Sequence, residues 1–378
     1  MHRLLQGDVG SGKTFVAIAA ILLAVESGAQ AVLMAPTRIL ASQHALTFHR
    51  WLHPLGLRIA LLTGARSDDS TPFSPLSADS PPHIIIGTHA VLHGNRLANP
   101  GLIVIDEQHK FGVAQRNALA AQSSAPDVLV MTATPIPRSL TMTLYGDLDL
   151  STLDEMPAGR QPITTAVRIN PDPVQIAAFL RSQFAAGRQA YLVFPLIDES
   201  SSLAVRAATR EVETWRTRLP DHQLGLLHGR TPADEKDDLM ERFRANSIHA
   251  LCATSVVEVG VDIPNASVIL IFDADRFGLA QLHQLRGRVG RGPHKSFCIL
   301  ITNGENPDTT ARLQLLEKTS DGFAVAEADL RIRGPGDLMG TAQSGLPDLR
   351  LGDLIRDAPL VRTCLLYTSD AADDSLRV

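Results

Sequence analysis

The chain has 378 residues, of which 44% are hydrophobic and 20% charged, with a formal net charge of −5 at pH 7. This composition excludes wholesale disorder, and the length predicts two or three domains. Three widely spaced cysteines exclude a disulfide framework and a CxxC metal site, and no apolar stretch reaches the roughly 20 residues of a membrane span. Because the first residues also lack the layout of a secretory signal, we expect a cytoplasmic protein with no membrane partner.

Short apolar runs recur along the chain, and each is followed by polar or glycine-rich residues. In the first half the runs are Leu4–Leu5, Val32–Ala35, Ile59–Leu62, Ile84–Ile86, Leu102–Ile105 and Val128–Met131. In the second half they are Tyr191–Phe194, Leu224–Leu227, Ala250–Ala253, Val268–Phe272 and Phe297–Ile301. Helical patterns lie between most of them, for example at Thr14–Glu26, Leu40–Leu52, Asp172–Ala186 and Pro232–Arg244. Continuous apolar runs that alternate with helices predict βαβ units, and two series of them predict two α/β lobes with mainly parallel sheets.

Two segments between the runs have the composition of connections. The stretch from Met156 to Pro162 is rich in proline and glycine, and it is a plausible linker between the lobes. The stretch from Ala65 to Pro82 is rich in serine, aspartate and proline, which predicts a flexible surface loop. In open α/β sheets ligands bind beyond the carboxyl ends of the strands, so the polar residues after the runs are candidate site residues.

The strongest motif is GDVGSGKT at residues 7–14, which fits G-x-x-x-x-G-K-[ST] at every fixed position. It follows an apolar run and opens a helix, which is the context of a phosphate-binding P-loop. Glycines let backbone N–H groups surround an anion, Lys13 neutralises phosphate oxygens, and the Thr14 hydroxyl is a ligand for Mg²⁺. The alternative, a chance glycine loop, is disfavoured by the context. The candidate nucleotide-binding residues are therefore Gly7, Gly10, Ser11, Gly12, Lys13 and Thr14.

Two further motifs carry charges suited to phosphate chemistry. Asp106 and Glu107 follow an apolar run, so that Asp106 can bind magnesium while Glu107 orients or deprotonates water. The alternative is an exposed acidic turn. In the second half, Arg288 and Arg291 lie in a glycine-rich stretch, and their guanidinium groups suit the charge of a transferred phosphate. The alternative there is a solvated basic turn.

The order of these motifs resembles that of superfamily-two helicases, and longer stretches are similar to the RecG family of ATP-dependent DNA helicases. These stretches are GDVGSGKT, DEQHKFGVAQR (106–116), MTATPIPRSL (131–140), VVEVGVDIPNA (256–266) and RFGLAQLHQLRGRVGRG (276–292). The segments 328–336 and 340–345 are similar to the translocation motif that this family shares with the transcription-repair coupling factor. The resemblance covers the chain from about Arg3 to about Val361.

The resemblance implies two RecA-like lobes that bind ATP and Mg²⁺ between them. Lys13, Glu107, Gln284, Arg288 and Arg291 would be catalytic, and Thr14 and Asp106 would bind the metal. Gly260 and Asp262 would couple the nucleotide to closure of the lobes.

The net charge gives no overall sign of nucleic-acid binding, so any such surface must be local. The residues that the resemblance places on DNA or on the coupling path are Thr37, Arg38, Thr88, His89, Thr132, Thr134, His228, Arg230, Thr254, Arg331, Arg333 and Gln343. Ordinary roles also fit single members: a helix cap for Thr88, a turn for His228 and a solvated helix surface for Arg331. The Gly-Pro-Gly at 334–336 predicts a bend between helical segments of a hairpin.

The domains expected from this resemblance are an ATP-binding lobe at 1–157, a second lobe at 158–310, a translocation hairpin region at 311–361 and a non-native tail at 362–378. The expected function is an ATP-hydrolysing DNA helicase that remodels stalled forks and Holliday junctions by moving along duplex arms. The family implies a monomer and single-strand binding protein as a further partner. We do not expect this sequence to include the family's wedge domain or its adenine-recognition residues. Two alternatives therefore stay open: a DNA-binding module with impaired ATP turnover, and the motor of a transcription-repair coupling factor.

Overall fold

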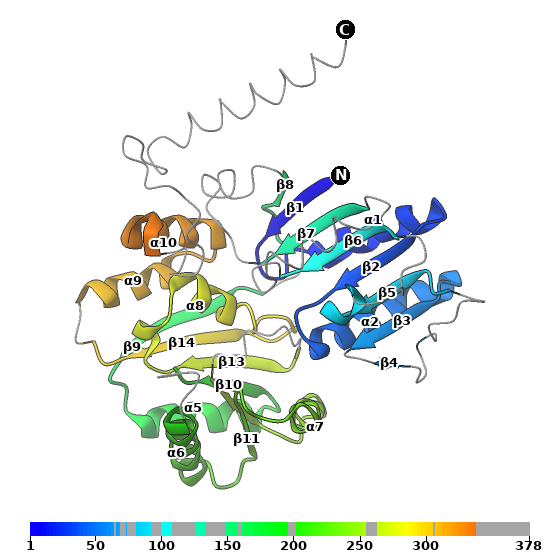
Figure 1. Ribbon diagram of the computed structural model, residues 1–378. Coiled ribbons are helices and arrows are strands. Elements are labelled where there is room, and N and C mark those ends of the chain that lie inside the picture. Colours follow the sequence, from blue (N-terminus) through cyan, green and yellow to red (C-terminus); the bar gives the residue numbers. More distant parts are fainter. Residues whose placement is uncertain are drawn as a thin grey trace.

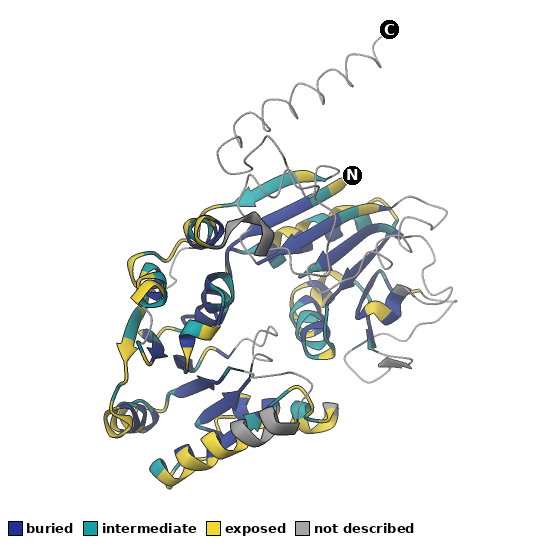
Figure 2. Cartoon of the chain, turned by 60° about the vertical axis from the view of Figure 1, so that its left-hand side comes forward, coloured by how far each residue is buried: buried dark blue, intermediate teal, exposed yellow. Residues whose placement is uncertain are grey.

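The computed structural model describes residues 1–63, 66–68, 73, 81–92, 100–107, 126–133, 148–157, 161–195, 202–254, 263–304 and 307–337. These residues form two lobes that lie side by side, each built on a twisted sheet (Figure 1). The strands at the centre of each sheet are almost wholly buried, whereas the outer faces of the helices are exposed (Figure 2). None of the helices in these ranges combines the length and the apolarity that crossing a bilayer requires.

The first lobe contains, in its described part, an eight-stranded sheet. Its strands are β1 (His2–Gly7), β2 (Gln30–Met34), β3 (Ile59–Thr63), β4 (Arg66–Asp68), β5 (Ile84–Gly87), β6 (Pro100–Asp106), β7 (Asp127–Thr132) and β8 (Asp149–Leu153). Their order is β4-β3-β5-β2-β6-β7-β1-β8, and only β4 is antiparallel to its neighbour. Helices α1 (Lys13–Glu26) and α2 (Arg38–Leu52) pack on one face, with Ile21 and Phe48 fully buried. Short 3₁₀ turns lie at η1 (His53–Leu55) and η2 (His89–Leu92).

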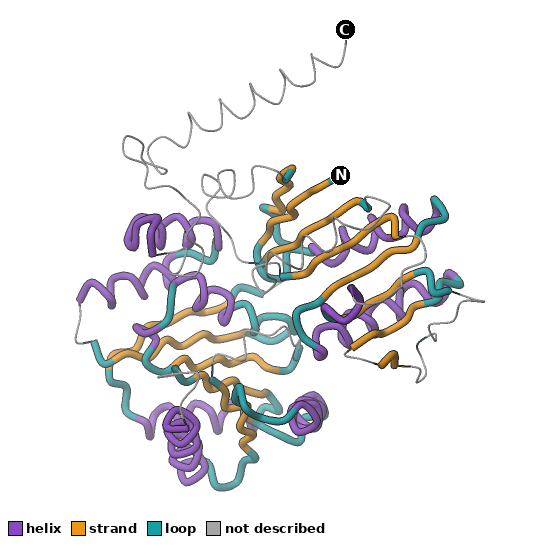
Figure 3. Tube along the Cα trace, viewed as in Figure 1, coloured by secondary structure: helices purple, strands orange, loops and turns teal. Residues whose placement is uncertain are grey.

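The second lobe contains a six-stranded sheet that is parallel throughout. Its strands are β9 (Ile163–Ile169), β10 (Gln189–Val193), β11 (Leu224–Leu227), β12 (Ala250–Ala253), β13 (Ala266–Ile271) and β14 (Ser296–Thr302), in the order β11-β12-β10-β13-β14-β9. Helices α5 (Pro173–Ala185) and α6 (Ser202–Arg218) cover one face. The other face is covered by α7 (Ala233–Arg244), α8 (Leu279–Arg286), α9 (Pro307–Lys318) and α10 (Gly322–Asp337), with η5 (Ala274–Arg276) before α8. Figure 3 shows these helical layers on either side of the strands.

The predicted fold class is confirmed: every apolar run identified in the sequence overlaps a strand, and both sheets are mainly parallel. Three strands were missed. Strands β8 and β9 lie at sheet edges and are only half-buried, so their sequences, DLSTL and ITTAVRI, contain polar residues in place of a continuous apolar run. Strand β4 falls within the stretch 65–82 that we expected to be a loop, where it pairs with β3 through main-chain hydrogen bonds that need no apolar pattern.

The predicted bend at residues 334–336 is wrong, because α10 continues without interruption to Asp337. Proline and glycine disfavour a helix interior, but here they fall in the last turns. Val325, Ala326 and Leu330, earlier in the helix, are buried. Packing of that face contributes more to helix stability than the local propensity of three residues at one end.

Candidate active site

The loop between β1 and α1 has the backbone geometry of an anion cradle. Gly10 and Gly12 have φ values of +79° and +93°, a left-handed conformation that favours glycine. Gly12 is the N-cap of α1 and no side chain caps the helix, so its N-terminus is open to an anion. The Ser11 hydroxyl in this loop is buried and has no hydrogen-bond partner among the described residues. Open helix N-terminus and unpartnered hydroxyl together fit a phosphate group.

Lys13 is buried at the start of α1 and points back into the loop. Its Nζ donates hydrogen bonds to the carbonyl oxygens of Gly7 and Asp8, at 2.9 Å and 2.8 Å. Burial lowers the pKa of Lys13, and the charges of Glu107, Asp106 and Asp8 oppose that shift. The ammonium group therefore lies in a desolvated position where acceptors surround it, as expected of a group that binds phosphate oxygens.

The two carboxylates after β6 have different surroundings. Asp106 Oδ2 lies 2.8 Å from His44 Nε2 on α2, and Glu107 Oε2 accepts a hydrogen bond of 3.4 Å from the Ala133 N–H. Burial raises the pKa of Glu107, and the charge of Asp106 raises it further. Burial would also raise the pKa of Asp106, but His44 and the Lys13 ammonium outweigh it and hold that pKa below its usual range. Asp106 is thus the more readily ionised carboxylate and Glu107 the more basic one, a division that fits a metal ligand next to a proton acceptor.

These residues also fit a magnesium ion. The Thr14 hydroxyl and the Asp106 carboxylate line the same cavity, and oxygen ligands of this kind, completed by water and phosphate, are typical of Mg²⁺ sites. His44 was not predicted from the sequence. It is one of several polar residues on α2, and only the packing of α2 on the first sheet brings it to Asp106.

Three predicted residues of the second lobe reach this cavity. Gln284 lies on α8, and Arg288 and Arg291 lie in the turn that follows it. Together with Lys13 and Glu107 they line one cavity of about 400 Å³ between the lobes. The charge of Arg288 lowers the pKa of Glu107, and that of Arg291 lowers the pKa of Lys13, so both guanidinium groups act electrostatically on the first lobe.

The two lobes approach each other closely beside this cavity, where the backbone of Gly287 meets the side chain of Val9. Gly287, directly after α8, faces Val9 of the P-loop, and a β-carbon at Gly287 would lie only 2.7 Å from Val9 Cβ and Cγ1. No real β-carbon sits so near another heavy atom, so this contact requires glycine.

The predicted nucleic-acid residues of the first lobe follow the carboxyl ends of neighbouring strands. Thr37 and Arg38 follow β2, and Thr88 and His89 follow β5, which pairs with β2. Thr37 caps α2 by accepting a hydrogen bond of 3.4 Å from the Leu40 N–H. Thr88 is buried, whereas Arg38 and His89 are exposed. Arg38 also lies 3.9 Å from Asp237 on α7, an exposed ion pair between the lobes that contributes little to stability. Thr132, at the end of β7, is buried close to the Glu107 segment.

In the second lobe His228 follows β11 and Thr254 follows β12, the strand that pairs with β11. The Nδ1 atom of His228 and the hydroxyl of Thr254 are buried without a hydrogen-bond partner among the described residues. Burial and the charges of Lys236 and Arg230 lower the pKa of His228, which favours the neutral imidazole. Arg230 is exposed. Unpartnered polar atoms at adjacent strand ends are consistent with a ligand at this edge.

The remaining predicted residues have partial or no description. Arg331 is exposed on α10, and Arg333 is on the same helix without a described side chain. The others, Thr134, Gly260, Asp262 and Gln343, lie outside the described residues.

Family models match three parts of the chain. Residues 2–143 match the DEAD/DEAH box helicase family, residues 180–293 match the helicase conserved C-terminal domain, and residues 319–375 match the C-terminal part of domain 3 of the ATP-dependent DNA helicase RecG. The third match includes most of residues 362–378, which we expected to be a non-native tail. An ATP-dependent DNA helicase RecG of Synechocystis sp. is 48% identical over 377 residues, which is 99% of this chain and 45% of that relative. The chain belongs to the RecG family.

Other relatives agree in extent. The RecG helicases of Streptococcus pneumoniae and Bacillus subtilis are 46% and 45% identical over 96% of the chain, and the chain covers 54% of each. This RecG-family chain therefore spans about half the length of the curated relatives it matches. A solved structure of RecG bound to a three-way DNA junction has a TM-score of 0.77 and 40% identity, covering 96% of this chain and 47% of that one. S. cerevisiae Dbp5 bound to RNA and ADP BeF3 has a TM-score of 0.62 at 16% identity, with 86% and 84% covered, and shows a shared fold alone.

We predict that Gly287→Ala impairs ATP hydrolysis, because the added methyl group forces α8 away from Val9 and withdraws Arg288 and Arg291 from the cavity. Overpacking of this kind costs about 1–3 kcal/mol, so the phosphate-release rate should fall about tenfold or more. The double variant Gly287→Ala with Val9→Gly removes the opposing atoms and should recover part of the rate. A rate for Gly287→Ala equal to that of the parent would show that the close approach does not set the lobe positions.

We also predict that His44→Ala raises the magnesium concentration needed for half-maximal hydrolysis. Without its hydrogen bond the Asp106 carboxylate is less well oriented, and loss of such a partner weakens metal binding by about 10–100-fold. A magnesium titration of the phosphate-release rate measures the effect. His49→Ala, on the same helix and stacked on His53 at 4.4 Å, is the matched control and should leave the magnesium dependence unchanged.

Proposed function

We propose that this chain is the ATP-hydrolysing motor of a double-stranded DNA translocase, with helicase activity. The observation that carries the proposal is the shared cavity, where Lys13 and Glu107 of the first lobe meet Arg288 and Arg291 of the second. A phosphate chain bound there contacts both lobes at once. Binding and release of ATP then close and open the lobes, and this is the motion that a translocase needs.

Each group in the cavity has a distinct task in hydrolysis. Glu107, whose pKa burial raises, accepts the proton of the attacking water. Lys13, Arg288 and Arg291 offset the negative charge that the transferred phosphate spreads over its oxygens. Gln284 lies beside them and positions the water or the phosphate. Thr14 and Asp106 would hold Mg²⁺, which when bound neutralises phosphate charge and orients the oxygens.

Coupling to DNA runs through the segment at the end of β7. The Ala133 N–H, directly after Thr132, donates a hydrogen bond to the Glu107 carboxylate. Thr37, Thr88, His228 and Thr254 follow strand ends of the two sheets and would contact the phosphate backbone. Contacts of that kind position a protein on DNA without reading its sequence, as movement along a duplex requires. Arg331 and Arg333 on α10 would transmit the stroke to the duplex, and Gly260, Asp262 and Gln343 would complete the coupling path.

The substrates we propose are branched DNA molecules, namely stalled replication forks and Holliday junctions, engaged through their duplex arms. The RecG structure solved on a three-way DNA junction supports this choice. The match of residues 319–375 to the RecG-specific family model favours this reading over the motor of a transcription-repair coupling factor. We propose that the protein works as a monomer in the cytoplasm, with single-strand binding protein as a further partner.

The decisive experiment is phosphate release with and without branched DNA. We predict that Lys13→Ala lowers DNA-stimulated ATP hydrolysis by at least about a hundredfold, because the buried ammonium is lost from the phosphate site. Lys295→Ala, an exposed lysine beside Phe297 in the second lobe, is the matched control and should hydrolyse ATP like the parent. Undiminished hydrolysis in Lys13→Ala would overturn the active-site assignment. A parent chain that binds DNA and releases no phosphate would instead favour a DNA-binding module with impaired turnover.

We predict that Arg331→Ala separates hydrolysis from movement. The exposed guanidinium lies far along α10 from the cavity, so ATP turnover should stay within about threefold of the parent while strand separation per ATP falls about tenfold. Parallel measurements of phosphate release and of strand separation on a fork give the ratio. Arg210→Ala, an exposed arginine on α6, is the control for loss of surface charge. Equal strand separation per ATP in Arg331→Ala and parent would exclude the coupling role.

A further inference from the structure

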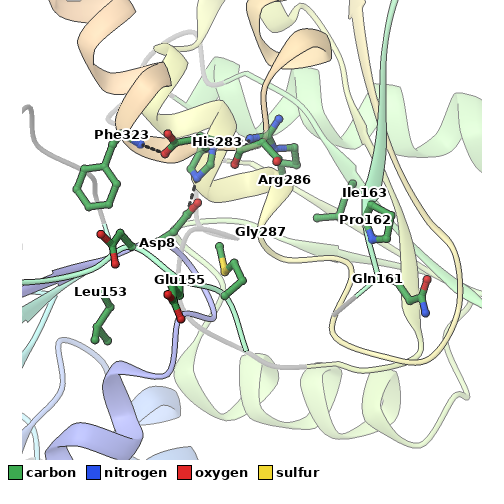
Figure 4. A pocket seen from close by; sticks show the side chains of 14 residues that line it. Asp8, Leu153, Glu155, Gln161, Pro162, Ile163, His283, Arg286, Gly287 and Phe323 are labelled. Carbon is green, nitrogen blue, oxygen red and sulfur yellow. Dashed lines mark hydrogen bonds and ion pairs between the residues drawn. The ribbon is translucent and has the colours of Figure 1, made fainter. Parts of the chain in front are cut away.

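Asp8, the second residue of the P-loop, carries a buried carboxylate that faces away from Lys13 toward three different parts of the chain. Its Oδ1 accepts hydrogen bonds from the Val9 N–H at 2.6 Å and from His283 Nε2 at 2.5 Å. Its Oδ2 accepts a bond of 3.3 Å from the Gly322 N–H. A buried carboxylate is stable only when donors satisfy it, and here the donors come from the P-loop, from α8 and from the first residue of α10. Figure 4 shows His283 directly opposite Asp8 at the edge of a second cavity.

The hydrogen bonds of His283 determine its tautomer and the orientation of its ring. Arg286 Nη2 lies 2.7 Å from His283 Nδ1, and an arginine can only donate, so Nδ1 must carry the lone pair. The proton of the neutral ring is therefore on Nε2, which faces Asp8. The bonds run in one direction, from Arg286 to His283 to Asp8.

Arg286 anchors this chain of bonds to the segment before α10. Its Nη1 donates to the carbonyl oxygens of Leu316 and Thr319, both at 2.8 Å, and its Nη2 donates to that of Ser320 at 3.2 Å. Asp8 is thus joined to α10 twice: directly through Gly322, and indirectly through His283, Arg286 and the residues that end α9.

The main chain of Asp8 contacts Lys13, the proposed phosphate ligand. Its carbonyl oxygen accepts the bond of 2.8 Å from Lys13 Nζ, and the attraction between its charge and the Lys13 ammonium opposes the lowering of the Lys13 pKa by burial. When Lys13 turns to a phosphate group, Asp8 loses this donor and this attraction. Its carboxylate keeps the hydrogen bonds from Val9, His283 and Gly322, and we expect those from His283 and Gly322 to become stronger.

We propose that Asp8 is a positioning residue that reports nucleotide binding at Lys13 to the start of α10, through its hydrogen bonds to His283 and Gly322. The proposal rests on the proposed function, because it takes Lys13 to be the phosphate ligand. Asp8 acts through other residues and transfers no proton itself. Since α10 carries Arg331, the relay gives the ATP cavity a path to the helix that would act on DNA, separate from the path through Glu107 and Ala133.

Amide hydrogen exchange of the full chain, with and without a non-hydrolysable imido analogue of ATP, tests the relay. In the parent we expect the analogue to slow exchange at residues 7–14 and, about tenfold, at the Gly322 amide. Asp8→Asn removes the charge and keeps only one acceptor oxygen, so that its NH2 group opposes the donor of either His283 or Gly322. His283→Leu removes the ring nitrogens while keeping the volume. Both should lose the slowing at Gly322 and keep it at residues 7–14. The double variant should lose no more than either single one, because the two residues act as one unit.

Two further variants separate the relay from general damage. Glu155→Gln removes an exposed carboxylate from the same cavity and should behave like the parent. His283→Gln keeps an N–H donor for Asp8 and should restore part of the slowing, which a purely structural role would not produce. Slowing at Gly322 that persists in both Asp8→Asn and His283→Leu would overturn the relay. So would a parent that protects residues 7–14 and not Gly322. No protection at residues 7–14 in the parent would overturn the proposed function and the relay with it.

Discussion

The close approach of the turn after α8 to the P-loop is the constraint on which the site depends. Gly287 has no side chain, and Val9 fills the space that one would occupy. Because the Gly287 backbone lies against the Val9 side chain, Arg288 and Arg291 reach the cavity that Lys13 and Glu107 line. A separation of a few ångströms would withdraw both guanidinium groups from the cavity and leave Lys13 with the carboxylates and the loop of its own lobe. The chemistry of the first lobe is therefore incomplete without the geometry of the second.

Within that cavity, the neighbouring groups shift the pKa values of the adjacent carboxylates Asp106 and Glu107 in opposite directions. His44 and Lys13 keep Asp106 ionised, whereas burial and the charge of Asp106 make Glu107 more basic. Under the proposed function, carboxylates at consecutive positions would thereby supply a metal ligand and a proton acceptor. The left-handed backbone of Glu107, with φ of +55°, is what turns the second carboxylate away from the first and toward the Ala133 N–H.

Much of this architecture could be predicted from local sequence patterns. The rest depends on contacts between segments that are distant in the sequence. The P-loop is identifiable because glycine spacing and lysine position are dictated by backbone geometry, and the central strands because both of their faces are apolar. Strands β8 and β9 were not predicted, because they lie at sheet edges, are partly exposed to solvent and therefore lack a continuous apolar run. His44 and His283 carry no local pattern at all: each becomes significant only when packing brings it to Asp106 or Asp8. The continuous helix at 334–336 was mispredicted because a buried face upstream outweighed proline and glycine.

The hydrogen bonds of Asp8 also bear on how the protein folds during its synthesis. His283 is 275 residues and Gly322 is 314 residues further along the chain. A ribosome delivers the amino-terminal lobe first, and such a lobe can fold while the remainder is still being translated. Its nucleotide loop nevertheless stays unfinished until nearly the whole described chain has emerged. Until the second lobe has been synthesised, the shared cavity also lacks the guanidinium groups of Arg288 and Arg291.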